Sequence, residues 1–144
     1  MPKWFVDFDW GLNIEFVRSS FLPANVGLTD FSVLNFTIKV SSLVRAFLEC
    51  LFLVPQKHSF QECYQLMEGL NNLVPKEVQN LLELCNSIKV KRLFLFMAEK
   101  ADHSWVDYLD FEKIDLGKGK RSIERNGIYD SKYKITIPSD LENG

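Results

Sequence analysis

Parts of the first forty residues alternate hydrophobic and polar positions with a period of two. Three stretches show this alternation: Trp4–Trp10, Leu12–Phe16 and Leu34–Val40. Successive side chains of a strand point to opposite faces, so the pattern is typical of half-buried strands. The segment Phe21–Asp30 contains proline, asparagine and glycine. We therefore predict three N-terminal strands, with a loop at Phe21–Asp30.

From residue 41 onward the hydrophobic positions follow the period of helices. We predict four of them, at Leu43–Leu53, about Phe60–Leu70, a helix with Pro75 in its first turn, and about Val90–Ala101. Ser59 with Glu62 forms a capping-box pattern, and proline suits a first helical turn. The first helix is hydrophobic nearly all round and should be central. The last two should bury Val78, Leu81, Leu82, Cys85, Val90, Leu93, Phe94 and Met97.

After Gly117 the pattern returns to that of strands. Lys120–Arg125 and Tyr133–Ile137 lie on either side of an Asn126-Gly127 turn pattern, which predicts a hairpin or two strands with a longer loop. The order of strands, helices and strands predicts an α+β fold, in which the C-terminal strand pair completes a small mixed sheet. We predict one domain over residues 1–138 and a disordered polar tail at 139–144.

Composition narrows the class of protein. The chain has 144 residues, of which 47% are hydrophobic, as expected of one globular domain. Its three cysteines, Cys50, Cys63 and Cys85, form no C-x-x-C pair, and no secretory signal precedes them. We predict reduced thiols in a cytoplasmic protein. No stretch approaches the roughly 18 hydrophobic residues of a membrane span, so no membrane contact is expected.

Residues that could support catalysis are few. Asp7 and Asp9 would share one face of a strand and could bind a metal ion, but they equally fit a solvent face. The two histidines, His58 and His103, have no zinc-ligand spacing, although a catalytic pair with cysteine or serine is compatible with the sequence. We predict that the protein is not an enzyme and has no metal or cofactor.

Positive charge gathers late in the chain. Residues 88–134 carry 11 Lys/Arg and 8 Asp/Glu, whereas the whole chain has a net charge of −2. The predicted contact residues for a protein or nucleic acid are Lys89, Lys91, Arg92, Lys118, Lys120, Arg121 and Arg125. Each group also has a structural interpretation. The first three could pair with carboxylates such as Glu83, and the others could be solvated residues of a glycine-containing turn.

Several motifs together resemble one family. The stretch from Ser59-Phe60 to Leu66-Met67-Glu68-Gly69-Leu70-Asn71-Asn72-Leu73 resembles the "SFEHA…L..GL.NL" helix of AbiEi-family antitoxins. The resemblance continues through Pro75–Glu83, Val90–Phe96, His103-Ser104-Trp105, Ile114–Arg121 and Tyr133–Pro138. Pro2-Lys3-Trp4-Phe5 is similar to the entry into the same domain. The chain departs from the family at Ser41–Ala46, where many members carry an acidic residue before the arginine.

The resemblance implies an antitoxin domain of a bacterial type IV toxin–antitoxin system, which defends against phage by abortive infection. Such antitoxins combine an N-terminal winged-helix repressor with a C-terminal domain that counters a nucleotidyltransferase-like toxin, AbiEii, without needing a stable complex. This chain starts at the C-terminal domain, so we expect the winged-helix domain to be absent from it. The alternative is an auxiliary DNA- or RNA-binding module that contributes to autoregulation of the operon.

Overall fold

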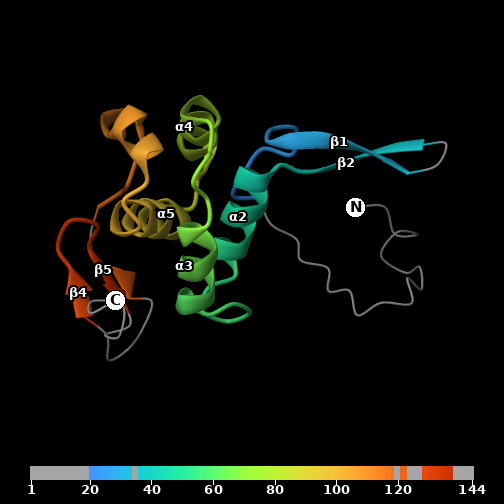
Figure 1. The fold of residues 1–144 in the computed structure, drawn as a ribbon. Coiled ribbons are helices and arrows are strands. Elements are labelled where there is room, and N and C mark those ends of the chain that lie inside the picture. The colour runs from blue at the N-terminus through green and yellow to red at the C-terminus, as the bar shows by residue number, and fades with distance from the viewer. Residues whose placement is uncertain (1–19, 34–35, 119–120, 123–127, 138–144) are drawn as a thin grey trace.

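In the residues that the structure describes, four α-helices form the centre and two small sheets lie on either side of them (Figure 1). The structure is a computed structural model, and it describes residues 20–33, 36–118, 121–122 and 128–137. The predicted strands at Trp4–Trp10 and Leu12–Phe16 lie outside these residues, as do Asp7, Asp9 and the tail at 139–144. The α+β fold is confirmed in the part that the structure describes.

The four predicted helices are present, with ends that differ by a few residues. They are α2 (Leu43–Phe52), α3 (Phe60–Glu68), α4 (Pro75–Leu84) and α5 (Ile88–Lys100). A serine caps three of them. The side chains of Ser42, Ser59 and Ser87 each accept a hydrogen bond from the backbone N–H three residues later. Pro75 occupies the first turn of α4. These local sequence features fix where the helices begin.

The core surrounds α5. Its side chains at Val90, Leu93, Phe94 and Met97 are fully buried, as predicted, and Phe94 contacts the rings of Phe47 and Trp105. Helix α2 buries Val44, Phe47, Leu48 and Leu51. Two short 3₁₀ helices, η1 (Ser104–Tyr108) and η2 (Phe111–Lys113), follow α5. None of the described helices combines the length and hydrophobicity needed to cross a membrane.

Strands β1 (Leu28–Val33) and β2 (Phe36–Ser41) form an antiparallel ribbon that projects from the helices (Figure 1). The prediction of a loop at Phe21–Asp30 is therefore wrong from Leu28 onward. Leu28, Asp30 and Ser32 alternate with Thr29 and Phe31, and this mixture of polar residues concealed the strand. The ribbon is a sheet of its own, so these strands do not join the C-terminal sheet.

Within the described part of the chain, the C-terminal sheet has three strands in the order β3-β5-β4. They are β3 (Arg121–Ser122), β4 (Ile128–Asp130) and β5 (Ile135–Ile137). Strand β5 pairs in parallel with β3 and antiparallel with β4, so the sheet is mixed, as predicted. Of the two alternatives for Lys120–Arg125 and Tyr133–Ile137, the hairpin is wrong, because β3 and β5 run parallel. The other alternative, a pair of strands with a longer connection, is confirmed in the described residues. The hairpin joins β4 to β5 through residues 131–134 instead.

Candidate functional site

Lys89 lies in the first turn of α5, yet its charge serves the end of another helix. Its Nζ donates to the carbonyl oxygens of Phe52 at 2.7 Å and Val54 at 2.6 Å. The last carbonyls of a helix have no partner within the helix, and a cation there is favourable. Burial lowers the pKa of Lys89. This cation therefore stabilises the end of α2. Its partners are backbone carbonyls, whereas one of the two predictions was pairing with a carboxylate.

Lys91 and Arg92 are inside the fold, with 3% and 2% of their surface exposed. The Nε of Arg92 donates to the carbonyl of Leu116 at 2.8 Å, and its Nη1 donates to the carbonyl of Lys134 at 3.4 Å. The expectation that these two cations offer an outer contact surface is therefore corrected. Arg92 instead joins α5 to two later segments, one just before β3 and one just before β5.

The segment that Arg92 holds leads directly into the basic residues of the C-terminal part. Gly117 has a φ of 70°, and a Cβ there would lie 3.1 Å from the Cγ1 of Ile88. Glycine is required by both its conformation and its close approach to α5. The next residue, Lys118, is exposed. The chain at Leu116–Lys118 is thus fixed against the start of α5, with a lysine pointing away from the core.

We call residues Lys118–Arg125 the basic segment. The backbone of Arg121 pairs with Ile135 in the sheet, and Arg92 holds the carbonyl of Leu116, two residues before the basic segment begins. Lys120 and Arg125 lie outside the described residues. Of the seven predicted contact residues, the structure thus brings Lys89, Lys91 and Arg92 together at the start of α5, with the start of the basic segment beside them.

A polar cluster that the sequence did not predict lies between α5 and the hairpin β4–β5. The hydroxyl of Tyr133 donates to the carboxylate of Glu99, and the Nζ of Lys132 lies 2.6 Å from the same carboxylate. Burial and this carboxylate raise the pKa of Tyr133 far above its ordinary value. A cavity of about 380 Å³ opens here, lined by Phe96, Glu99, Lys100, Ile128, Tyr129, Asp130, Lys132, Tyr133 and Ile137.

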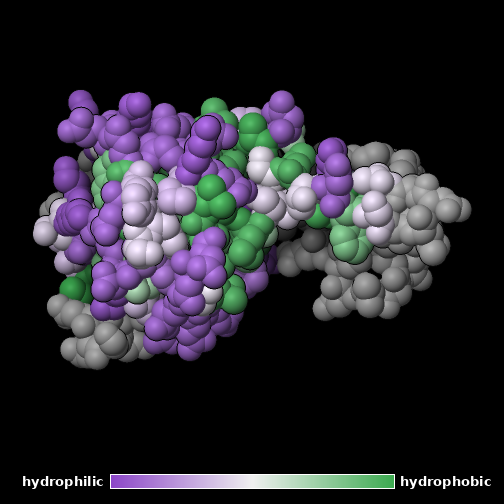
Figure 2. All heavy atoms as spheres, turned by 45° about the horizontal axis from the view of Figure 1, so that its top comes forward, coloured by the Kyte–Doolittle hydropathy of each residue, from purple (hydrophilic) through white to green (hydrophobic). Residues whose placement is uncertain are grey.

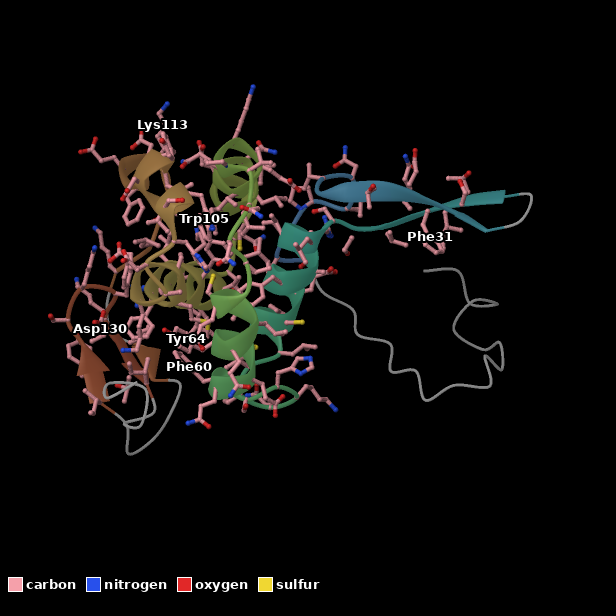
Figure 3. The ribbon with its side chains drawn as sticks, viewed as in Figure 1. Phe31, Phe60, Tyr64, Trp105, Lys113 and Asp130 are labelled. Carbon is pink, nitrogen blue, oxygen red and sulfur yellow. The ribbon has the colours of Figure 1, made fainter. Side chains whose placement is uncertain are left out.

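His103 has a structural environment. It is buried, its Nε2 lies 2.6 Å from the carbonyl oxygen of Met67, and its ring stacks on Trp105 at 5.4 Å between centroids. Trp105 in turn donates to the carbonyl of Leu70 at 2.8 Å and lies among the helices (Figure 3). Both rings therefore satisfy carbonyls at the end of α3. In the described part of the chain, no three His, Cys, Asp or Glu residues are grouped to hold a metal ion.

Comparison with known proteins supplies a family. The model of one family, described as "Transcriptional regulator, AbiEi antitoxin, Type IV TA system", matches residues 1–138. Comparisons with curated proteins and with solved structures gave no match. The matched range contains the helices, both sheets and the basic segment. The chain therefore belongs to the family of AbiEi antitoxins of type IV toxin–antitoxin systems.

Proposed function

We propose that this domain counteracts a nucleotidyltransferase-like toxin of the AbiEii type, and that the basic segment is the surface that does so. The observation that carries the proposal is the exposed Lys118, which begins the basic segment two residues after Leu116, whose carbonyl a buried arginine binds. The domain acts by recognition, as a cytoplasmic protein of a bacterial phage-defence system, and needs no cofactor or catalytic residue of its own.

A basic segment that begins beside an anchored stretch of chain suits recognition for two physical reasons. Ordering a loop when a partner binds costs free energy, and a loop that is already held avoids part of that cost. Clustered charges of one sign also raise the rate of encounter with an oppositely charged surface. Residues 118–125 carry four Lys/Arg and one Asp/Glu. The expected target is therefore an acidic surface of the toxin, or the nucleic acid on which the toxin acts.

Co-expression with the toxin tests the proposal. We expect that the variant Lys118→Glu with Lys120→Glu loses rescue of growth, because two cations become anions at the contact surface. The matched control is Lys76→Glu with Lys113→Glu, which changes the charge equally at two other exposed lysines. Circular dichroism and expression level should be the same for both variants. Full rescue by the basic-segment variant would refute the assignment.

A second function is favoured by the family description, which names a transcriptional regulator. Here the basic segment would contact the phosphates of operator DNA. Each phosphate contact releases counterions, so the affinity should fall linearly with the logarithm of the salt concentration. Gel-shift titrations of the wild type and the two charge variants at two salt concentrations measure this slope. Binding that is absent at low salt, or equal for both variants, would exclude this role for the basic segment.

A further inference from the structure

The β1–β2 ribbon has one polar and one apolar side. The register pairs Phe31 with Ile38 and Thr29 with Val40, and alternate residues of a strand share a face. Phe31, Ile38 and Val40, together with Thr29, form what we call the apolar side. The polar side carries Asp30 paired with Lys39, and Ser32 hydrogen-bonded to Thr37 at 3.2 Å. Figure 3 shows Phe31 below the ribbon, while polar side chains extend above it.

The apolar side lacks a cover among the described residues. Phe31 is 55% exposed and Ile38 is 43% exposed, whereas the hydrophobic residues of β5 are buried. Hydrophobic and hydrophilic side chains lie next to each other on the projecting ribbon in Figure 2. A two-stranded hairpin alone is marginally stable in water, and it gains stability when further strands or a helix cover a hydrophobic face. A cover on this side would therefore stabilise the ribbon.

The base of the ribbon is firmly attached to the helices. The Nη1 of Arg45 donates to the carbonyls of Pro23 at 2.7 Å and Val26 at 2.5 Å, and the N–H of Ser42 donates to Gly27 at 2.7 Å. The carbonyl of Ser20 accepts from Asn86 at 3.1 Å. The segment before Ser20 is thus tethered to the same body from which the ribbon projects.

We propose that residues 4–16 of this chain pack on the apolar side of the ribbon. Every second residue is hydrophobic, at Trp4, Val6, Phe8, Trp10, Leu12, Ile14 and Phe16. Four of the six residues between them are polar or charged, and the other two are Phe5 and Gly11. An extended chain rises about 3.3 Å per residue, so this segment can run along the six-residue strands and return. A tethered segment also has an effective concentration in roughly the millimolar range.

Hydrogen–deuterium exchange of the full chain tests the proposal. The amides of residues 4–16 should exchange at least about 100-fold more slowly than those of an unstructured peptide. Phe31→Asp should abolish that protection and leave α5 unchanged. The matched control is Ser32→Asp, the next residue on the polar side, which should retain protection. A reciprocal variant, Val6→Asp, should speed exchange in both strands of the ribbon while the helices stay protected.

Each other occupant predicts a different result. Protection of residues 4–16 or of the ribbon that grows with protein concentration would identify a second copy and overturn the proposal. Protection of the ribbon that appears only when the toxin is added would also overturn it, because the cover would then be a partner. Fast exchange of residues 4–16 in the wild type, or equal effects of Phe31→Asp and Ser32→Asp, would contradict it directly.

Discussion

The two sheets of this protein are similar in size and opposite in burial. In β5, Ile135 is 0% and Ile137 is 4% exposed, whereas in the ribbon Phe31 is 55% and Ile38 is 43% exposed. Both sequences place large hydrophobic residues at alternate positions. The difference lies in the neighbours, because Tyr133 beside β5 meets Phe96 of α5 at 6.5 Å between ring centroids. Alternation thus predicts that a strand has an apolar side. That side becomes part of the core only where a neighbouring element packs against it.

The two sheets are also attached to the helices in different ways. The C-terminal sheet is joined to α5 by a buried guanidinium and by hydrophobic packing, so its basic segment starts from a fixed point. The ribbon is attached at its base, through Arg45 and Ser42. We expect the C-terminal sheet to contribute more than the ribbon to the stability of the described fold. The variants below test that order.

The largest effect is expected for Ile135→Ala in β5. Truncating a fully buried isoleucine loses hydrophobic burial and leaves a cavity, so the free energy of unfolding should fall by about 2–5 kcal/mol. Thr37→Ala on the exposed polar side of the ribbon should change it by less than about 0.5 kcal/mol. Urea unfolding measures both values. Similar losses for the two variants would contradict the distinction between the sheets.

Arg92→Met should have the next largest effect. It removes the donors to the carbonyls of Leu116 and Lys134, and each hydrogen bond from a charged group contributes about 1.5–3 kcal/mol. The methionine restores some packing, so we expect a net loss of about 2–3 kcal/mol in the same urea experiment. Toxin rescue should weaken as well, because the basic segment loses its anchor. An unchanged free energy of unfolding would refute the role of Arg92.

Alkaline pH should weaken the C-terminal region through Tyr133. Burial and Glu99 raise its pKa in the folded state, so the unfolded chain loses this proton first, near pH 10. Stability is therefore retained below that pH and falls as the pH rises above it, by about 1 kcal/mol at pH 11. Tyr133→Phe should flatten this dependence when unfolding is followed from pH 9 to 11. The same slope in both proteins would contradict the assignment.

The smallest effect is expected for the ion pair of the ribbon. The side chains of Lys39 and Asp30 are 66% and 60% exposed, and exposed pairs contribute roughly 0–1 kcal/mol. A double-mutant cycle with Lys39→Ala and Asp30→Ala should give a coupling free energy near the lower end of that range. Added salt should reduce it further. A coupling above about 1 kcal/mol would mean that the ribbon is more rigid than its exposure implies.

The helices could be predicted from sequence because their determinants are local. Ser59 caps α3 through the N–H of Glu62, three residues away, and Pro75 marks the start of α4. The strands depended on distant partners. The sequence of Leu28–Val33 is mixed in polarity, and its strand character becomes evident only from its pairing with β2. Strand β4 has only three residues, Ile128–Asp130. Short strands give too few positions for a period to be recognised.

The candidate site could be predicted only where the chain faces solvent. Lys118 is exposed, as expected of a surface residue, and its role in contacting a partner stays a prediction. Arg92 has the same charge and lies in a similarly basic stretch, but its partners are carbonyls 24 and 42 residues later. The polar cluster around Glu99 likewise forms with Lys132 and Tyr133, 33 and 34 residues away. No local sequence pattern predicts such long-range contacts.

The most direct measurement of the central claim is the survival of cells that express the toxin together with each antitoxin variant. The account predicts that the pair of charge reversals at 118 and 120 abolishes survival, while the equal reversal at 76 and 113 preserves it. Equal survival with the two folded variants would show that the basic segment is not what opposes the toxin.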